Sequence, residues 1–351
     1  MKNNRKRQWI ITVILFALVF CLLITGCGSK AHPSYKSVLK DIDIYFKTEG
    51  GLNKKEDPTL ASWYRPGDSL SDWMIISELR QGADVDKEKY LRDITAYVAE
   101  AYKGENKLGR VKATEWHRIT LAMLLAGGDP RHIPDGNGST IDLFADGVYD
   151  WTQTEKLNTQ GSNALIYALN VIRAGGYDIP KDAKYQEETI IDMLLEYQGE
   201  NGAFGLNGSG EDVDITAMAV QALAPFASKY EKLRDAVDAA IEYLSRMQSP
   251  GGFYVFGDHY SSETCSQVIM ALTAAGIDPR KDERFFKSGV SVADALMSFR
   301  NGDGGFASQL DRNGKPEKSD LLATRQAASA ITSILLLEKG NGDYYNLTYT
   351  Q

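Results

Sequence analysis

Cysteine is scarce in this chain of 351 residues, and its placement excludes a disulfide-stabilised fold. Of the three cysteines, Cys21 and Cys27 lie in or just after an apolar N-terminal run. Cys265 is therefore alone in the body of the chain, and no intramolecular disulfide is expected there. A body of roughly 300 residues can be stable through one large hydrophobic core.

Several signatures of well-known sites are missing. The chain has no His-Glu-x-x-His zinc motif, no Gly-x-Ser-x-Gly nucleophile motif, no phosphate-binding loop and no dinucleotide fingerprint. The acidic turns at Asp303 and Asp311 lack the ligand series of a calcium loop. We therefore expect no cofactor and no metal. Alternating stretches typical of β-strands are missing too, which leaves helices as the main elements.

Basic residues are outnumbered by acidic ones. The formal net charge is −8 at pH 7, and it would be −12 without residues 1–26, which hold four basic residues and no acidic one. An acidic body argues against nucleic acid as a partner and against electrostatic attachment to anionic lipid.

The N-terminal segment has the pattern of a secretion signal. Its four basic residues precede an apolar run at 9–23, which leads to Ile24-Thr25-Gly26-Cys27. This ending resembles the bacterial lipobox, whose cysteine is lipidated and becomes the mature N-terminus. We expect a lipoprotein signal peptide at 1–26, a lipidated tether at 27–34 and a single domain at 35–351. The resemblance implies attachment to the cell membrane through Cys27, on its extracytoplasmic face; an uncleaved transmembrane anchor is the alternative.

Apolar residues recur at helical spacing in twelve segments of the body. The predicted helices cover residues 35–47, 69–81, 87–103, 115–127, 139–147, 160–175, 182–198, 213–227, 230–248, 262–276, 287–300 and 321–338. Charged amphipathic helices alternate with helices that are nearly uncharged after their first turn. Helices that are apolar all round must be buried on all sides. The pattern therefore predicts an all-α fold of six helical hairpins, with an inner and an outer ring.

Three glycine-rich turns divide the C-terminal half at similar intervals. They begin at Gln198, Gln248 and Arg300, which are fifty and fifty-two residues apart. Such a period indicates repeated supersecondary structure. Glycine permits backbone angles closed to other residues, and the aromatic residue of each turn can pack on the preceding helix. We interpret these aromatic residues as structural; they are Phe204, Phe253 and Phe306.

These turns, with helices of the form Thr-Ala-x-Ala-x-x-Ala-Leu, resemble the prenyltransferase and squalene-oxidase repeat, most strongly over residues 107–338. That superfamily of α/α toroids includes class II terpene cyclases, protein prenyltransferase β subunits and the helical domain of transcobalamin and intrinsic factor. The resemblance implies an (α/α)6 toroid, and it leaves the activity open because one fold hosts many functions. Long loops enter the inner helices and meet at one mouth, where a site is expected.

Four polar residues occupy equivalent positions in the first turn of inner helices, each nine residues before a leucine. They are Glu115, Gln160, Asp214 and Glu263. An acid at this place can simply stabilise the helix N-terminus, by about 0.3–1 kcal/mol. The same residues can also ring the mouth, where neighbouring carboxylates raise one another's pKa and produce a proton donor.

Two of these positions lie in segments similar to catalytic motifs of the superfamily. The sequence 212–217 is similar to the Asp-x-Asp-Asp-Thr-Ala motif of class II terpene cyclases, which implies Asp214 as a catalytic proton donor; Ile215 replaces the third acid. Glu263-Thr264-Cys265 has the spacing of the Asp-x-Cys zinc pair of protein prenyltransferases. The matching turn at 323–326 supplies no histidine, so we expect a buried thiol and no zinc.

Aromatic side chains are expected to enrich the mouth, where they suit apolar or sugar-like ligands. Trp151, Phe256 and Tyr260 are further candidates for this rim. The candidate ligand-binding residues are Trp73, Glu115, Trp116, His117, Gln160, Asp212, Asp214, Tyr254 and Glu263.

The sequence favours a membrane-anchored ligand-binding protein over an enzyme. The resemblance implies a small, apolar or amphiphilic ligand of isoprenoid or corrinoid type. In transcobalamin a separate β domain covers the ligand, so a β-domain protein is an expected partner here. The alternatives are a glycan hydrolase or lyase that uses the mouth carboxylates, a terpene cyclase that uses Asp214, and a scaffold whose barrel is filled by side chains. A glycan hydrolase needs two carboxyl groups ~5–5.5 Å or ~6.5–9.5 Å apart.

Overall fold

The computed structural model of the chain describes residues 33–208 and 210–347. One compact unit begins at Leu39 and includes the described chain from there onward. The expected signal peptide and Cys27 lie outside the described residues. No helix within the described ranges is both long enough and apolar enough to cross a membrane.

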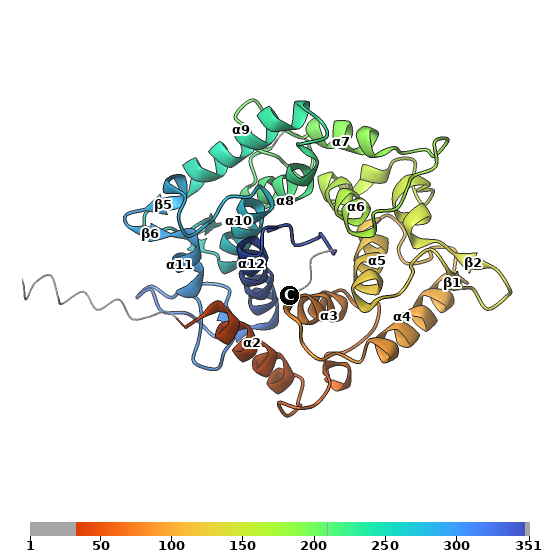
Figure 1. The fold of residues 1–351 in the computed structure, drawn as a ribbon, viewed down its shortest axis with the longest axis horizontal. Coiled ribbons are helices and arrows are strands. Elements are labelled where there is room, and N and C mark those ends of the chain that lie inside the picture. The colour runs from red at the N-terminus through yellow and green to blue at the C-terminus, as the bar shows by residue number, and fades with distance from the viewer. Residues whose placement is uncertain (1–32, 209, 348–351) are drawn as a thin grey trace, which may run out of the picture. The chain divides into compact units, whose positions relative to one another are not determined.

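Six helices of the described chain form a closed inner ring (Figure 1). In order around the ring they are α3 (Ser69–Gln81), α5 (Thr114–Ala126), α6 (Ser162–Gly175), α8 (Val213–Leu223), α10 (Ser262–Ala274) and α12 (Leu321–Glu338). Each helix packs against the next, and α12 packs against α3, which closes the ring. The helices predicted to be buried on all sides therefore stand inside.

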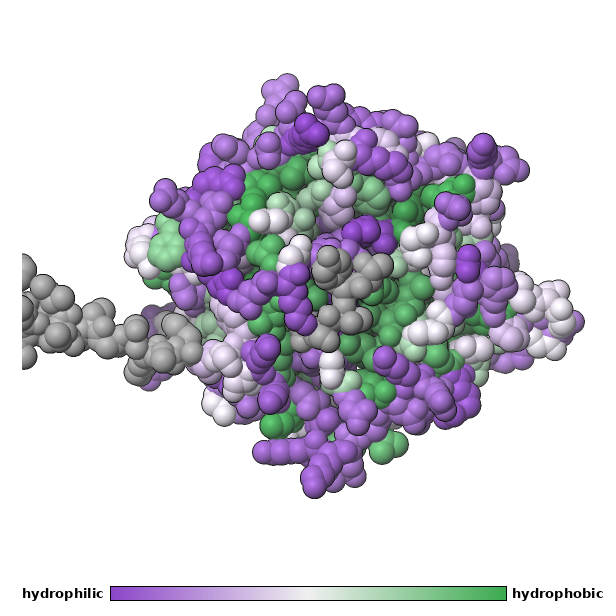
Figure 2. Space-filling model, in the orientation of Figure 1, coloured by the Kyte–Doolittle hydropathy of each residue, from purple (hydrophilic) through white to green (hydrophobic). Residues whose placement is uncertain are grey.

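The outer ring contains four charged amphipathic helices of the described chain and one short helix with a single charged residue. They are α2 (Tyr35–Glu49), α4 (Lys87–Ala101), α7 (Glu187–Leu195), α9 (Lys232–Met247) and α11 (Val292–Met297). In α9, for example, Leu233, Val237, Ile241 and Leu244 are buried at helical spacing, whereas charged residues face solvent. Figure 2 shows the result for one face, with apolar residues around the centre and hydrophilic residues at the periphery. The predicted concentric arrangement is confirmed.

The sixth outer segment differs from the prediction of a helix at 139–147. Residues Thr140–Ile141 form strand β2, which pairs with β1 (Ile133–Pro134), and a π-helical turn follows at Ala145–Tyr149. The Asp142 carboxylate accepts a hydrogen bond from the Ala145 backbone N–H and starts this turn. The segment is too short for regular helical bonding to outcompete these local contacts.

Three more hairpins of two-residue strands occur, which the sequence did not predict because such strands carry no alternating pattern. They are β3–β4 (Val255–Phe256, His259–Tyr260), β5–β6 (Phe286–Lys287, Val290–Ser291) and β7–β8 (Phe306–Ala307, Ser319–Asp320). Strands β5 and β6 replace the beginning of the helix predicted at 287–300. The helix predicted at 213–227 ends at Leu223, where Pro225 follows in a 3₁₀ turn.

The repeated turns dock each outer element on the next one around the ring. Their glycines have positive φ, +88° at Gly202, +84° at Gly252 and +94° at Gly304. A Cβ atom at these positions would lie 2.3 Å from the Ala239 carbonyl oxygen of α9, 2.7 Å from that of Ser291 and 2.6 Å from that of Asp41 in α2. Glycine is thus required twice over, by conformation and by close approach. The last contact joins the end of the chain's repeats back to α2.

The aromatic residue of each turn is fully buried against an inner helix. Phe204 and Phe306 donate their backbone N–H groups to the hydroxyls of Thr216 and Thr324, each at 2.8 Å. In the second turn the fully buried aromatic residue is Tyr254. The interpretation of Phe253 as the structural aromatic residue is therefore wrong by one position. In all three turns the buried aromatic residue comes two positions after the glycine with positive φ.

Candidate functional site

The first turns of the inner helices lie at one end of the ring, which we call the mouth. Hydrogen bonds there join each of three inner helices to the segment before the next one: Ser162 N–H to the Leu206 carbonyl, Ser262 N–H to the Ser308 carbonyl, and the Thr114 hydroxyl to Gln160 Oε1 at 3.4 Å. Gln160 lies in a 3₁₀ turn before α6, and not in the first turn of an inner helix as predicted. Asp212 and Ser261 cap α8 and α10 through the N–H groups of residues three positions later. Asp212 thus has a capping role.

Asp214 is a mouth carboxyl whose surroundings strongly perturb its protonation. Burial raises its pKa from 3.8 to about 6, with further contributions from the charges of Asp212 and Glu263; the nearby Thr264 hydroxyl opposes the shift. Its Oδ1 atom is buried and has no hydrogen-bond partner in the described chain. A partly protonated carboxyl near neutral pH can serve as a proton donor.

Glu263 is held firmly by hydroxyl groups. Its Oε2 atom accepts bonds from Ser261 and Ser262, at 3.3 and 3.1 Å, and its Oε1 atom accepts one from Ser308 at 2.7 Å. Ser308 belongs to the loop before α12, so Glu263 also ties two mouth loops together. The charge of Glu263 contributes to the raised pKa of Asp214, so these two predicted residues lie near each other.

Glu115 is neutralised by an ion pair. Arg118 Nη1 lies 2.5 Å from its Oε2 atom, and Arg118 Nε lies 3.1 Å from Oδ2 of Asp72 in α3. Asp72 is fully buried, and burial raises its pKa to about 6 although the Arg118 charge opposes the shift. No sequence pattern singles out Asp72 or Arg118 as partners, because their pairing depends on which helices become neighbours.

Trp116, His117 and Tyr254 are fully buried in the wall, so the expectation that they face a ligand is not met. Trp116 Nε1 donates to the Tyr102 hydroxyl at 2.7 Å. His117 Nε2 lies 2.7 Å from the Gly147 carbonyl oxygen, and burial lowers the pKa of this imidazole to about 4. The Tyr254 hydroxyl donates to the Leu244 carbonyl at 2.9 Å. The first two contacts join the inner helix α5 to outer elements, and the third joins the turn after α9 to that helix.

Inside the ring is a small lumen of about 170 Å³. Five inner helices line it: Trp73 from α3, Tyr167 from α6, Met218 from α8, Gln267 and Met270 from α10, and Arg325, Gln326 and Ser329 from α12. The rings of Trp73 and Tyr167 lie 5.5 Å apart. Gln267 donates to Gln326 at 2.8 Å and accepts from Gln221 at 2.9 Å, which makes a chain of amides across three helices.

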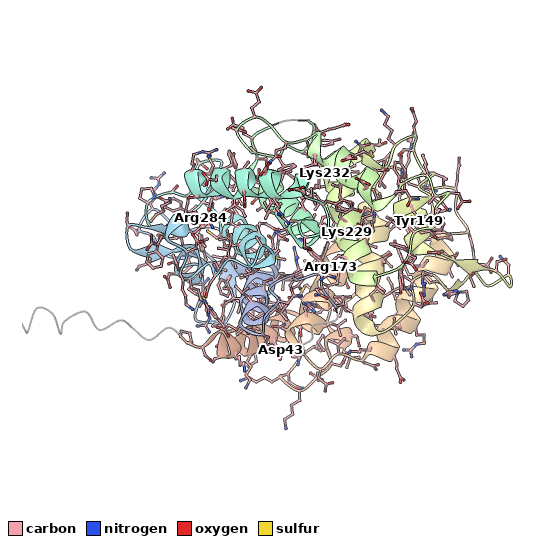
Figure 3. All side chains as sticks on the ribbon, turned by 45° about the horizontal axis from the view of Figure 1, so that its top comes forward. Asp43, Tyr149, Arg173, Lys229, Lys232 and Arg284 are labelled. Atoms are coloured by element: carbon pink, nitrogen blue, oxygen red, sulfur yellow. The ribbon has the colours of Figure 1, made fainter. Side chains whose placement is uncertain are left out.

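The segment after α12 closes the other end of the lumen, a feature that was not predicted from the sequence. It turns into the centre of the ring (Figure 1), where Tyr344 and Tyr345 are buried and line the lumen. Arg173, at the end of α6 (Figure 3), binds Asp343 with a distance of 3.1 Å from Nε to Oδ2. Ser329 donates to the Tyr344 hydroxyl at 3.2 Å. The two adjacent tyrosines after the last apolar helix are the one signal that could have indicated this plug.

A larger groove of about 800 Å³ lies at the mouth, between the β3–β4 hairpin and the loop 309–317. Its apolar side is formed by Val255 and by the rings of Phe253 and Tyr260, which stack 4.6 Å apart. Its polar side holds Asp258, His259, Gln309, Asp311, Arg312 and Glu317. Tyr260 is the one residue of this set that the sequence predicts at the rim, and no sequence pattern indicates the loop 309–317.

Comparisons with known proteins identify the fold. No protein-family model matches the sequence, and no curated protein matches it significantly. Solved structures do match. The chain has the α/α toroid fold.

Three of these structures represent different activities. Protein geranylgeranyltransferase-I of Candida albicans matches with a TM-score of 0.54 and 13% identity, over 86% of this chain and 92% of that chain. A type II terpene cyclase from Scytonema matches with 0.50 and 10%, over 86% and 99%. An unsaturated glucuronyl hydrolase from a Bacillus species matches with 0.51 and 12%, over 88% and 97%. The resemblance to the toroid superfamily is confirmed at the level of the fold, which does not select an activity.

Proposed function

We propose that this protein is a membrane-anchored, extracytoplasmic binding protein that holds a sugar-like ligand in the mouth groove. The groove carries the proposal, because its volume of about 800 Å³ falls in the ~300–1,000 Å³ range of ligand pockets. The 170 Å³ lumen is below that range. An isoprenoid or corrinoid would enter it only after the C-terminal segment had left.

The chemistry of the groove suits a carbohydrate. Pyranose rings present an apolar face that packs on aromatic rings, and hydroxyl groups that donate to carboxylates. The Phe253–Tyr260 stack offers the first kind of contact, and Asp258, Asp311 and Glu317 offer the second. An acidic groove without a dominant positive charge disfavours anionic ligands there.

Tyr260→Ala tests the groove. Soluble hexasaccharides of glucose, mannose and N-acetylglucosamine serve as probes in isothermal titration calorimetry. We expect one class to bind, Tyr260→Ala to weaken it at least tenfold by removing the stacking surface, and Tyr260→Phe to keep most of the affinity. Tyr97→Ala is the matched control, since Tyr97 is 38% exposed and Tyr260 37%. The proposal is contradicted if no hexasaccharide binds, or if Tyr260→Ala binds with the same affinity as the wild type.

The lipid anchor is part of the same proposal and has its own test. Cys27→Ser should abolish incorporation of a labelled fatty acid, because the lipidated residue is lost, whereas Cys21→Ser should keep it. Equal labelling of both variants contradicts a lipid on Cys27. A β-domain protein partner stays a prediction.

Acid catalysis on a bound glycan is a second candidate function, favoured by the raised pKa and unpaired Oδ1 atom of Asp214 beside Glu263. It predicts release of reducing ends from the hexasaccharide that binds, and loss of that release in Asp214→Asn. Asp238→Asn is the control, because Asp238 is exposed on α9 and does not line the groove. Binding without turnover by the wild type excludes this candidate.

A further inference from the structure

Arg325 carries a charge inside the lumen that no described residue compensates. It lies in the second turn of α12, and its guanidinium contacts the face of Trp73, with 5.5 Å from Cζ to the ring centroid. Its Nε atom is buried without a hydrogen-bond acceptor. Among the described residues, no carboxylate lies within ion-pair distance of it.

The nearest electrostatic influences on Arg325 do not neutralise it. Three come from the hydroxyls of Tyr167, Tyr344 and Tyr345, and the fourth and weakest from Glu263. Both oxygens of Glu263 are already engaged by serine hydroxyls. Burial lowers the pKa of Arg325, which is the expected sign for a cation removed from water.

An unpaired guanidinium in such a place is costly. Buried charges in proteins are almost always paired or hydrogen-bonded, because their desolvation penalty is several kcal/mol otherwise. Arg325 still borders free space, since it lines the lumen together with the amides of Gln267 and Gln326. Its planar fork of donors matches a carboxylate, which it can bind through two parallel hydrogen bonds.

We propose that the lumen holds a small organic monocarboxylate, bound through its carboxylate by Arg325 and through its apolar part by Trp73 and Tyr167. The volume of about 170 Å³ sets the size; it equals roughly five or six waters at ~30 Å³ each. Arg325 is the one cationic side chain among the described residues that line the lumen, and this selects a monoanion, because a phosphate dianion would bury one uncompensated negative charge. This site is separate from the mouth groove, and it does not depend on the function proposed there.

Thermal unfolding of the whole mature domain with benzoate tests the site. Benzoate combines a carboxylate with a ring of suitable size, benzamide is its neutral isostere, and inorganic phosphate is the competing anion. We expect benzoate to raise the Tm in a concentration-dependent manner and to change the fluorescence of Trp73, and benzamide and phosphate to do neither.

Variants of Arg325 locate the effect. Arg325→Met should abolish the benzoate response while its Tm without ligand equals or exceeds that of the wild type, because a buried unpaired charge is removed. Arg325→Lys should weaken benzoate at least tenfold, since the bidentate fork is lost. Arg312→Met, in the mouth groove, should respond like the wild type, and so should Tyr260→Ala.

Three results overturn the proposal. The first is no response to benzoate in the wild type. The second is an equal response in Arg325→Met, and the third is a response to phosphate alone. The glycan proposal concerns the mouth groove and the benzoate test concerns the lumen. Failure of glycan binding therefore does not change the result expected with benzoate.

Discussion

The Nε atom of Arg118 lies 3.1 Å from Oδ2 of Asp72, so a buried ion pair joins α5 to α3 inside the wall of the ring. Asp72 also accepts hydrogen bonds from the Tyr90 hydroxyl and the Gly67 N–H, each at 3.1 Å. One carboxylate thus ties two inner helices to the outer helix α4.

Arg118→Met should lower the free energy of unfolding by about 3–5 kcal/mol, because it leaves Asp72 buried without its counter-charge. Adding Asp72→Asn should recover part of this loss. Arg131→Met is the control, since the pair of Arg131 with Asp129 is exposed and such pairs contribute about 0–1 kcal/mol. Urea unfolding followed by circular dichroism measures all three variants. Equal losses for the two arginine variants would contradict the role of the buried pair.

Asp214 should make the stability of the wild type depend on pH. Its pKa is raised from 3.8 to about 6 in the folded protein, so the folded state binds the proton more tightly than the unfolded state. The stabilisation is therefore complete below about pH 4 and is lost as the pH rises through about 6. Asp214→Asn removes this dependence.

The difference in free energy of unfolding between the wild type and Asp214→Asn measures the effect of Asp214. The other titrating groups contribute equally to both proteins and cancel in this difference. The variant should be more stable by about 2–3 kcal/mol at neutral pH, and the gap should close below about pH 4. Urea unfolding at a series of pH values measures the gap, with the exposed Asp258→Asn as a control that stays level with the wild type. A gap that is constant with pH would falsify the assignment.

The two rings could be predicted from the sequence because the signal is local. Hydrophobic periodicity and the glycine-rich turns are properties of short segments, and the predicted segments at 69–81, 262–276 and 321–338 match α3, α10 and α12 closely. The mouth location of Asp214 and Glu263 followed from the same repeat, since equivalent positions of equivalent helices meet at one end.

The rest of the site depends on contacts between segments that no local pattern encodes. Glu115 and Arg118 are three residues apart on α5, so their pairing is local, whereas the pairing of Arg118 with Asp72 of α3 depends on which helices are neighbours. Tyr254 and Phe253 differ by one position, and only the docked glycine before them decides which ring is buried. The plug by Tyr344 and Tyr345 requires knowledge of where the chain goes after α12.

Gly202→Ala should destabilise the protein by more than the cost of its backbone conformation alone. The left-handed region costs a non-glycine residue roughly 1–2 kcal/mol, and here the new Cβ would also lie 2.3 Å from the Ala239 carbonyl oxygen. Gly276→Ala is the matched control, because Gly276 has φ +76° with open space around it. Thermal unfolding should show a clearly larger loss for Gly202→Ala. Similar losses would mean that the turn does not need its close approach to α9.

Cys265→Thr should fold normally, whereas Cys265→Ala should be less stable. Cys265 occupies in α10 the place that Thr216 and Thr324 occupy in α8 and α12, where a side chain accepts the backbone N–H of the buried aromatic residue. Threonine restores this acceptor, and alanine leaves the Tyr254 N–H unsatisfied at a cost of about 1–3 kcal/mol.

Thiol chemistry gives an independent check on Cys265. Burial raises the pKa of the thiol to about 12, so the native protein should react with a disulfide reagent only at the rate of unfolding, since the thiolate is the reactive form. Urea unfolding ranks the stability of the two variants, and labelling of the native wild type at pH 8 measures the reaction rate of the thiol. Fast labelling, or an alanine variant as stable as the threonine variant, would show that Cys265 has a role other than that of its threonine counterparts.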